Sequence, residues 1–183
     1  FRGTAGPWRG YYNTAMEGSL RAPCIIRWPG HVPRGRTSNE IVHITDLFTT
    51  LARAAGATLP TDRIIDGVDQ MDLFTGKQEK SNREGFPVFV FGKLHAVKWH
   101  DWKMHLLWKP DPQAPAVAEK RLFNLRSDPK EERNVLAANP SVDPWMLRAD
   151  TLVTLPSYHV LPMAPREGIV INVAEMRLYY FPK

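Results

Sequence analysis

The residues best suited to chemistry begin in a polar loop near the start of the chain, RGYYNTAMEGSLRAPCIIRWPG, residues 9–30. Two arginines, Arg9 and Arg21, flank one carboxylate, Glu17. The planar guanidinium group of arginine favours contact with an anion. The same three residues could instead hold the loop together as an internal ion-paired cluster. Residue chemistry alone leaves both interpretations open.

The single cysteine, Cys24, follows this loop and opens the apolar run Cys-Ile-Ile. With one cysteine, no intrachain disulfide is possible. A nucleophilic thiol needs an exposed, electropositive setting and a nearby base. We interpret residues 23–28 as a strand that stops at Pro29 and Gly30. Cys24 is therefore expected to be a buried structural residue.

The histidines show no spacing that is typical of a metal site: His31, His43, His95, His100, His105 and His159. No H-x-x-x-H pair or Cys/His cluster is present, which argues against zinc. His95 and His105 lie on neighbouring predicted strands, where a cross-strand surface pair is the simplest interpretation. The sequence also lacks the glycine-rich phosphate-binding loops and the G-x-S-x-G motif.

One amphipathic helix is predicted over TDLFTTLARAAG, residues 45–56. Its apolar residues recur on one face: Leu47, Phe48, Leu51, Ala52 and Ala55. Thr45 is the expected N-cap, Asp46 suits the positive end of the helix dipole, and Gly56 suits a left-handed position after the last turn. A short helical turn is expected at residues 71–74.

Extended segments dominate the second half of the chain. Strands are predicted over residues 86–91, 94–99, 102–108 and 121–125, with His100 and Asp101 as a two-residue hairpin turn. Alternation places Trp102, Met104, Leu106 and Trp108 on one face, and Lys103, His105, Leu107 and Lys109 on the other. We expect Lys103 and His105 to be outer-face residues. A helix over 143–154 and one more strand near 169–173 complete the prediction.

This pattern predicts an α/β fold whose first third is followed by a small antiparallel sheet with a helix. We place the end of an α/β domain at residues 1–60, a linker at 61–85 and the antiparallel subdomain at 86–183. Six tryptophans and eight phenylalanines provide enough apolar area for a folded core.

The net charge of +5 suits an anionic partner, but the basic residues are scattered and form no long run. We therefore expect no nucleic-acid partner. No apolar run approaches the roughly 18 residues of a membrane span. The chain begins at Phe1 inside a glycine-rich loop, which is typical of an internal fragment.

Several successive segments resemble the sulfatases of the alkaline-phosphatase-like superfamily. Residues 6–69, GPWRGYYNTAMEG through DGVD, look like the second half of a sulfatase catalytic domain. LHAVKWHDWKMHL and LFNLRSDPKEERNV look like the C-terminal subdomain of that family. The order and spacing of these segments also match over about the first 140 residues.

The resemblance implies hydrolysis of a sulfate ester by a formylglycine made within a C/S-x-P-S/A-R motif. It also implies a divalent cation, usually calcium, held by aspartates and an asparagine. Cys24 is followed by Ile25, Ile26 and Arg27, so it is not the formylglycine precursor. We expect the formylglycine and all metal ligands on sequence upstream of Phe1, in a missing N-terminal half that is this chain's partner.

The family pattern also assigns roles in the opening loop, R-G-G-K-G-[ST]-T-x-E-G-G-x-R-x-P. Glu17, Gly18, Arg21 and Pro23 match it, and the resemblance implies that Glu17 and Arg21 mainly hold the loop. The lysine that contacts sulfate in the family aligns with Tyr12, which donates a hydrogen bond but carries no charge at neutral pH.

We expect substrate contacts from Tyr12 and Arg9 in this loop. Lys93 and His95, in a segment that faces the active-site mouth of related sulfatases, are expected to recognise the leaving group. No catalytic residue and no metal ligand is expected in the chain itself, so the isolated chain should be inactive.

Two alternatives stay open. A related phosphohydrolase of the same superfamily would carry an upstream Thr or Ser nucleophile with zinc ligands. A non-catalytic module would bind sulfated polysaccharide through its basic surface. Family habit places such proteins in the periplasm or outside the cell, and in the lysosome for many animal members. The first predicted strand should pair with the missing half, so poor solubility is expected for the isolated chain.

Overall fold

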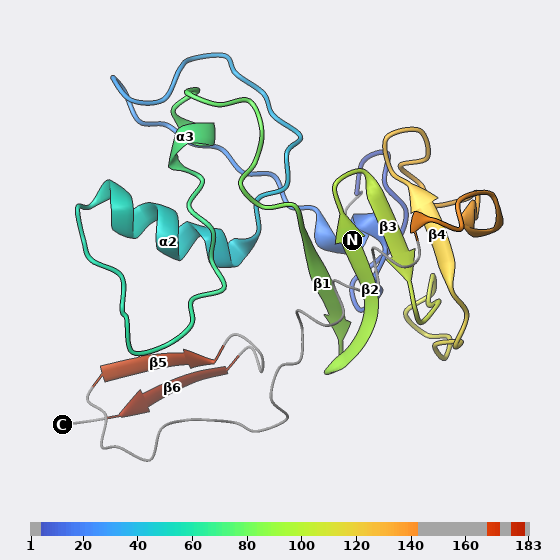
Figure 1. The fold of residues 1–183 in the computed structure, drawn as a ribbon. Coiled ribbons are helices and arrows are strands. Elements are labelled where there is room, and N and C mark those ends of the chain that lie inside the picture. Colours follow the sequence, from blue (N-terminus) through green and yellow to red (C-terminus); the bar gives the residue numbers. More distant parts are fainter. Residues whose placement is uncertain (1–4, 143–167, 173–176, 182–183) are drawn as a thin grey trace.

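The computed structural model describes residues 5–142, 168–172 and 177–181. Its antiparallel sheet of four strands lies beside a part built from helices and long loops, as Figure 1 shows. The helices are α1 (Glu17–Leu20), α2 (Ile44–Ala54), α3 (Met71–Phe74) and the 3-10 helix η1 (Leu136–Ala138). The strands are β1 (Gly85–Val90), β2 (Lys93–Trp99), β3 (Trp102–His105), β4 (Arg121–Asn124), β5 (Gly168–Asn172) and β6 (Arg177–Phe181). The helix predicted over 143–154 lies outside the described residues.

The main sheet is antiparallel, with strand order β1-β2-β3-β4, and a separate antiparallel pair joins β5 to β6. The strands predicted in the second half of the chain are confirmed, including the one near 169–173. The β2–β3 turn lies at His100 and Asp101, where Trp99 pairs with Trp102. His100 adopts a left-handed φ of 50°, as a two-residue hairpin turn requires. β3 ends at His105, earlier than predicted, and Trp108 instead forms an isolated bridge with Val117.

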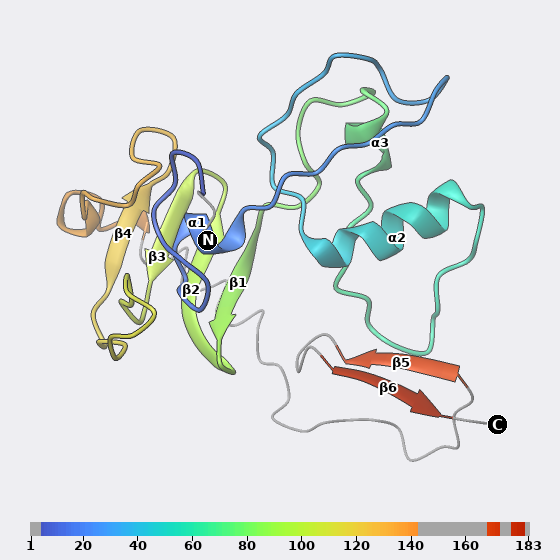
Figure 2. The same cartoon turned by 180° about the vertical axis from the view of Figure 1, so that it is seen from behind.

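One face of the sheet lies against the opening loop and α1, which Figure 2 shows from behind. Ala15 packs there with Val88, Val90 and Ala96. A second cluster joins the loop to β4 and its neighbours: Met16, Trp108, Phe123 and Leu125. The loop near the N-terminus therefore forms the cover of this face of the sheet.

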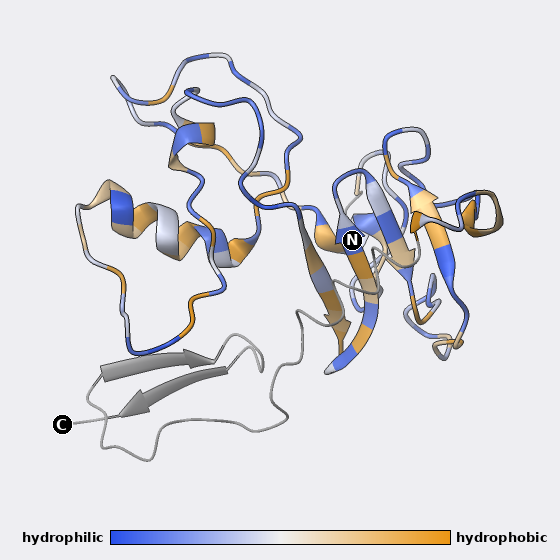
Figure 3. Ribbon diagram, in the orientation of Figure 1, coloured by the Kyte–Doolittle hydropathy of each residue, from blue (hydrophilic) through white to orange (hydrophobic). Residues whose placement is uncertain are grey.

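The opposite face carries its own apolar cluster, formed by Met104 and Leu122 with Trp99, Trp102, Leu106, Val135, Leu136 and Val142 packed around them. Figure 3 shows this alternation as orange and blue bands along the strands. The shared face of Trp102, Met104 and Leu106 is confirmed. The placement of Trp108 on that face was wrong, because strand geometry ends at His105 and the chain turns before Trp108.

Helix α2 begins with a capping box in which His43, not Thr45, is the N-cap residue. The His43 ring accepts a hydrogen bond from the Thr45 amide, and Asp46 accepts one from the His43 amide at 2.8 Å. Gly56 has a φ of 67°, which confirms the predicted left-handed position.

Polar groups anchor α2 to the chain that follows it. Asp46 is fully buried and accepts hydrogen bonds from the Val68 amide at 2.8 Å and the Arg83 guanidinium at 2.6 Å. Thr50 is also fully buried, and its hydroxyl accepts from the Gln70 amide at 2.9 Å. Residues 66–83 are therefore tied to the polar side of α2.

The apolar side of α2 faces outward. Phe48 is 55% exposed and Leu51 is 61% exposed. Ile25 and Ile64, in the loops on either side, are 94% and 93% exposed. Among the residues that the structure describes, nothing covers this apolar surface.

The prediction of a buried strand at residues 23–28 was wrong for the chain as it stands. The segment is irregular and Cys24 is exposed. A strand forms only where a neighbouring strand receives its backbone hydrogen bonds, and no described segment pairs with this one. No helix in the described part of the chain has the length and apolar character of a membrane span.

Candidate functional site

The opening loop closes on itself between Arg9 and Gly18. The Gly18 amide donates to the Arg9 carbonyl at 2.7 Å. A Cβ atom on Gly18 would lie 2.7 Å from that same carbonyl oxygen, so the backbones meet too closely for a side chain. Gly10 has a φ of 104°, and a Cβ there would lie 2.3 Å from the Cβ of Met16. Both glycines are required by the geometry of the loop.

The tip of the loop presents two tyrosines to solvent. The Thr14 hydroxyl donates to the Tyr11 carbonyl at 2.8 Å, and Asn13 takes a left-handed φ of 66°, which tightens the turn. Tyr12 is 83% exposed. The loop is thus a closed structure whose tip offers the Tyr12 phenol outward.

A buried ionic network anchors the loop to the sheet. The Glu17 carboxylate, fully buried, accepts from Lys98 Nζ at 2.8 Å and from Lys103 Nζ at 3.1 Å. Arg21 Nε donates to the same carboxylate at 2.7 Å. Arg21 also lies over the ring of Trp8, with its guanidinium carbon 4.7 Å from the ring centroid. The ion-paired interpretation of Glu17 and Arg21 therefore fits the structure.

Glu131 is the second carboxylate of this network and joins it to the chain after β4. Its Oε1 accepts from the Glu17 amide at 2.7 Å and from Lys103 Nζ at 3.3 Å. Its Oε2 lies 2.5 Å from His105 Nε2. The Glu131 carbonyl also accepts from Arg9 Nη1 at 3.5 Å. Glu131 thus connects both ends of the opening loop to β3.

Burial and the neighbouring charges shift the pKa values of Glu17 and His105 in this network. Burial alone would raise the pKa of Glu17, but Lys103, Lys98 and Arg21 outweigh it and lower that pKa to about 2. Burial also favours the neutral form of His105 and lowers its pKa. The Nδ1 atom of His105 has no partner among the described residues, so a second proton there would sit without an acceptor.

The prediction that Lys103 and His105 are outer-face residues was wrong, since both are fully buried. Strand alternation groups residues by face but does not say which face a distant segment will cover. Sequence reasoning also missed Lys98 and Glu131. Lys98, Lys103 and His105 share one face of the β2–β3 hairpin, and three basic groups on one face were a signal that carboxylates lie opposite.

The four predicted substrate-contact residues differ in exposure. Tyr12, Arg9 and Lys93 are exposed, whereas His95 is only 4% exposed. The interpretation of His95 and His105 as a surface pair was wrong. Both are buried, and since His105 pairs with Ala96, alternation turns His95 to the opposite face.

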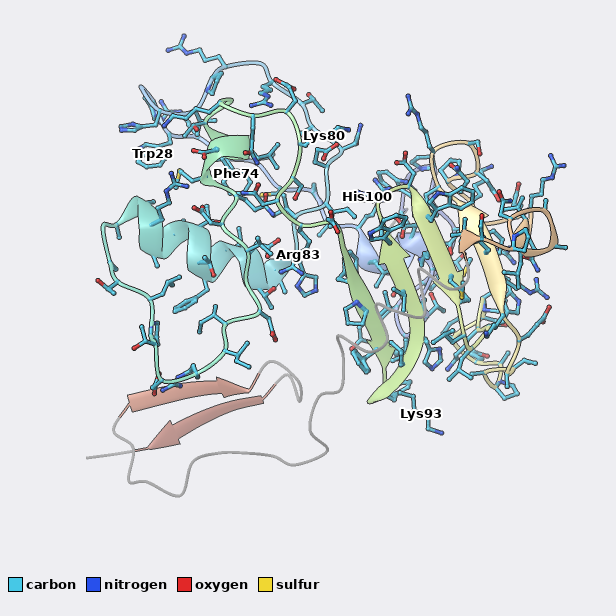
Figure 4. All side chains as sticks on the ribbon, in the orientation of Figure 1. Trp28, Phe74, Lys80, Arg83, Lys93 and His100 are labelled. Atoms are coloured by element: carbon cyan, nitrogen blue, oxygen red, sulfur yellow. The ribbon has the colours of Figure 1, made fainter. Side chains whose placement is uncertain are left out.

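Two of these residues, Lys93 and His95, lie close together near the β1–β2 end of the sheet. Figure 4 shows Lys93 projecting from the β1–β2 end, opposite His100 at the β2–β3 end. Lys93 and Lys109 are both close enough to His95 to contribute to lowering its pKa, after the larger effect of burial. The Arg9 guanidinium lies over the ring of Trp108, the residue next to Lys109, 5.7 Å from the ring centroid. Among the described residues, no hydrogen bond, ion pair or ring contact joins Tyr12 to the other three.

The described residues do not provide a cation site. Within ranges 5–142, 168–172 and 177–181, no group of three or more His, Cys, Asp or Glu residues is placed to hold a metal ion. The acidic groups that are buried, Glu17, Asp46 and Glu131, are already paired with lysine, arginine or histidine. Calcium therefore does not fit the residues that are present, and no step of chemistry can be assigned to it in this chain.

Comparison with known proteins gives sulfatases both by sequence and by structure. The family model for N-sulphoglucosamine sulphohydrolase, C-terminal, matches residues 8–146. Mouse steryl-sulfatase is 40% identical over 107 residues, which cover 58% of this chain and 17% of that protein. Dog N-acetylgalactosamine-6-sulfatase is 38% identical over 105 residues, covering 56% of this chain and 19% of that protein.

Among solved structures, a sulfatase from Pseudoalteromonas sp. superposes with a TM-score of 0.72 at 27% identity, covering 80% of this chain and 32% of that chain. A Bacteroides thetaiotaomicron structure described with the metabolism of multiple glycosaminoglycans gives a TM-score of 0.66 at 25% identity, with the same coverage of both chains. The chain spans less than a fifth of the length of the curated relatives it matches. Its four-stranded sheet matches the C-terminal subdomain of solved sulfatases, and the chain belongs to the N-sulphoglucosamine sulphohydrolase C-terminal family.

Proposed function

We propose that this chain is the C-terminal part of an enzyme that hydrolyses sulfate esters. The formylglycine nucleophile and a divalent cation, calcium by family habit, would come from sequence outside the chain, as would the N-terminal half of the catalytic domain. The chain alone would then be inactive. Family habit places the whole enzyme in the periplasm or outside the cell.

The observation that carries the proposal is the anchored opening loop. The loop is closed by the hydrogen bond from Gly18 to Arg9, and Glu17 attaches it to the sheet. The tip of the loop, at Tyr12, remains exposed to solvent and could contact a ligand. In sulfatases this loop brings a lysine to the sulfate. The exposed Tyr12 phenol stands at that position here, and it could donate a hydrogen bond to a sulfate oxygen.

The apolar surface supports the same proposal. Ile25, Phe48, Leu51 and Ile64 are large apolar residues that are all strongly exposed, and soluble proteins normally cover large exposed apolar areas. The missing half of a sulfatase domain would cover it and would also receive residues 23–28 as a strand.

Arg9 has a different role in this proposal. Its guanidinium is held by the Glu131 carbonyl and lies over Trp108, so it is placed beside the loop rather than at its tip. It would contribute positive potential that attracts a sulfate ester, and it would stabilise the bound anion from the side.

The experiment is made on the full-length gene product. The coding sequence upstream of Phe1 should contain C/S-x-P-S/A-R and paired aspartates. Tyr12→Phe should lower kcat/KM for an aryl sulfate roughly tenfold, as loss of one hydrogen bond to a charged group predicts. Tyr11→Phe, on the neighbouring tyrosine of the same turn, is the matched control. Equal activity of Tyr12→Phe and the unaltered enzyme would remove Tyr12 from the site. Absence of the upstream motifs would remove the sulfatase proposal itself.

A further inference from the structure

Glu131, in the turn after β4, combines a strained backbone with a fully buried carboxylate. Its φ of 57° is a left-handed conformation that suits glycine or asparagine better than glutamate. Asp128 fixes the turn, because its carbonyl accepts from the Glu131 amide at 3.2 Å and its carboxylate accepts from the Arg133 amide at 2.8 Å. Strained residues persist where many contacts fix them, and they concentrate at functional sites.

The contacts of Glu131 lead to both ends of the opening loop. Its Oε1 atom accepts from the Glu17 amide at 2.7 Å, across 114 residues of sequence. Its backbone carbonyl accepts from Arg9 Nη1 at 3.5 Å, across 122 residues. The same carboxylate contacts Lys103 and His105 on β3. Glu131 therefore ties the two ends of the loop to one strand of the sheet.

The β2–β3 hairpin supplies the second attachment of the loop. Lys98 and Lys103 stand directly opposite each other on the paired strands. Like charges in this arrangement destabilise a sheet. The Glu17 carboxylate accepts from both, at 2.8 Å from Lys98 Nζ and 3.1 Å from Lys103 Nζ. The sheet thus presents two ammonium groups that require a carboxylate, and the opening loop provides it.

These polar contacts fix the loop in a way that its apolar contacts do not. Ala15 and Met16 pack against the sheet, but apolar packing has no preferred direction. Hydrogen bonds have defined distances and angles, so the bonds to Glu17 determine where the loop lies along the sheet. Tyr12, at the exposed tip, takes its place from this base.

We propose that Glu131 is a positioning residue for the sulfatase reaction, whose carboxylate fixes the base of the opening loop and thereby the place of the Tyr12 phenol. This inference rests on the proposed function, because it gives Glu131 an effect on the contact between Tyr12 and sulfate. Glu131 does not itself touch the substrate. A misplacement of about 1 Å at a contacting group can lower a rate up to roughly a hundredfold, so a distant carboxylate can matter for turnover.

Glu131→Gln is the informative variant, because it keeps the shape of the side chain and removes its charge. It also replaces one carboxylate oxygen with an N–H donor. A buried N–H group then lacks an acceptor whichever ring nitrogen of His105 carries the proton, since His105 Nδ1 has no partner among the described residues. The base of the loop should shift as these groups separate.

The test is a double-mutant cycle in the full-length gene product, with kcat/KM for an aryl sulfate as the readout. Glu131→Gln should lower kcat/KM roughly five- to tenfold. Tyr12→Phe is expected to cost roughly tenfold in the unaltered enzyme, and it should cost less than about twofold in the Glu131→Gln background. Glu132→Gln, on the exposed neighbouring glutamate, is the matched control and should change neither value.

Hydrogen exchange of the full-length gene product follows the loop without relying on activity. In Glu131→Gln the amides of residues 9–21 should exchange roughly tenfold faster, while those of α2 keep their rate. Equal acceleration in both segments would show general destabilisation and would overturn the inference. Glu131→Gly suits the left-handed φ and removes the side chain, so it is the second variant should Glu131→Gln not fold. It should give the same two effects.

The proposed function and this inference fail through different results. No sulfate release by the unaltered full-length enzyme would overturn the proposed function. Sulfate release in which Tyr12→Phe costs tenfold in both backgrounds would overturn the positioning role of Glu131, as would unchanged exchange of residues 9–21 in Glu131→Gln. An active enzyme in which Tyr12→Phe has no effect would overturn it too, because Glu131 would then have no contact to position.

Discussion

Glu17 illustrates how a single residue determines the placement of the opening loop. It is fully buried, and its carboxylate meets Lys98, Lys103 and Arg21 within 3.1 Å. Buried ion pairs contribute little net stability as a group, because removing charges from water is costly. Removing Glu17 is different, since Lys98 would stay buried without a carboxylate partner and Lys103 would keep only Glu131.

Glu17→Gln should therefore destabilise the protein by about 3–5 kcal/mol. Two buried lysines would lose their shared anion, while the shape of the side chain would be nearly kept. Denaturant unfolding of the full-length gene product measures the change. Glu132→Gln, on an exposed glutamate next to Glu131, is the control and should change stability by less than about 0.5 kcal/mol. A loss below about 1 kcal/mol for Glu17→Gln would contradict the role given to the network.

His105 makes the fold sensitive to mild acid. Its pKa is lowered in the folded state by burial from an ordinary value of 6.5, so the unfolded chain takes up this proton first. A lowered folded pKa means that stability is present above pH 6.5 and is lost as the pH falls below that value. Glu17 adds a second loss at lower pH, between 4.5 and about 2.

The melting temperature should therefore fall between about pH 7.5 and about pH 5.5, before any carboxylate titrates. In His105→Gln the amide can still donate to Glu131, and this decline should become shallower. His31→Gln, on an exposed histidine, should leave the decline of the melting temperature unchanged. A decline of equal steepness in His105→Gln and the unaltered protein would show that His105 does not titrate as described.

At the scale of elements, α2 is held by its polar side. Asp46 is fully buried and pairs with Arg83, whose side chain is 12% exposed. Hydrogen bonds from Arg83, Val68 and His43 outweigh burial and lower the pKa of Asp46. This one carboxylate joins the start of α2 to the segment that leads into β1.

Asp46→Asn should destabilise the protein by about 3–5 kcal/mol, because the largely buried Arg83 guanidinium would lose its carboxylate partner. Asp62→Asn is a matched comparison, since Asp62 pairs with Arg63 on the surface, with side chains 65% and 54% exposed. Its loss should be within about 1 kcal/mol. Equal losses in the two variants, measured by denaturant unfolding, would mean that burial of the Asp46 pair has no special effect.

Some of the helices and strands could be predicted from the sequence, and some of their contacts could not. Strands β1 to β4 and helix α2 were predictable, because alternation and helical spacing are local properties. Which face of the sheet the opening loop covers could not be predicted. The partners of Lys103 on that face, Glu17 and Glu131, lie 86 and 28 residues away in the sequence. The strand predicted at 23–28 depends on a neighbour that is not among the described residues. The substrate contacts of Tyr12 and Arg9 stay predictions from the loop pattern, and the structure adds that both side chains are exposed.

At the scale of the whole molecule, the exposed apolar residues on and around α2 predict the behaviour of the isolated chain. A surface that includes Ile25, Phe48, Leu51 and Ile64 favours self-association in water. It is the side on which we place the missing half of the catalytic domain.

The isolated chain should therefore aggregate at micromolar concentration, as measured by light scattering, and Phe48→Glu together with Ile64→Lys should reduce the aggregation. Lys77→Glu with Lys130→Glu changes charge without removing apolar area and is the control for net charge. A monomeric isolated chain with cooperative unfolding would contradict the assignment of this surface as an interface.

The central claim is that the chain is one part of a sulfatase, and sulfate release tests it most directly. Inorganic sulfate from an aryl sulfate, and phosphate from the matching aryl phosphate, would be measured for the full-length gene product and for the 183-residue chain alone. We predict sulfate release by the full-length protein, little phosphate release, and no turnover by the chain alone. Faster release of phosphate than of sulfate, or sulfate release by the 183-residue chain itself, would contradict the account.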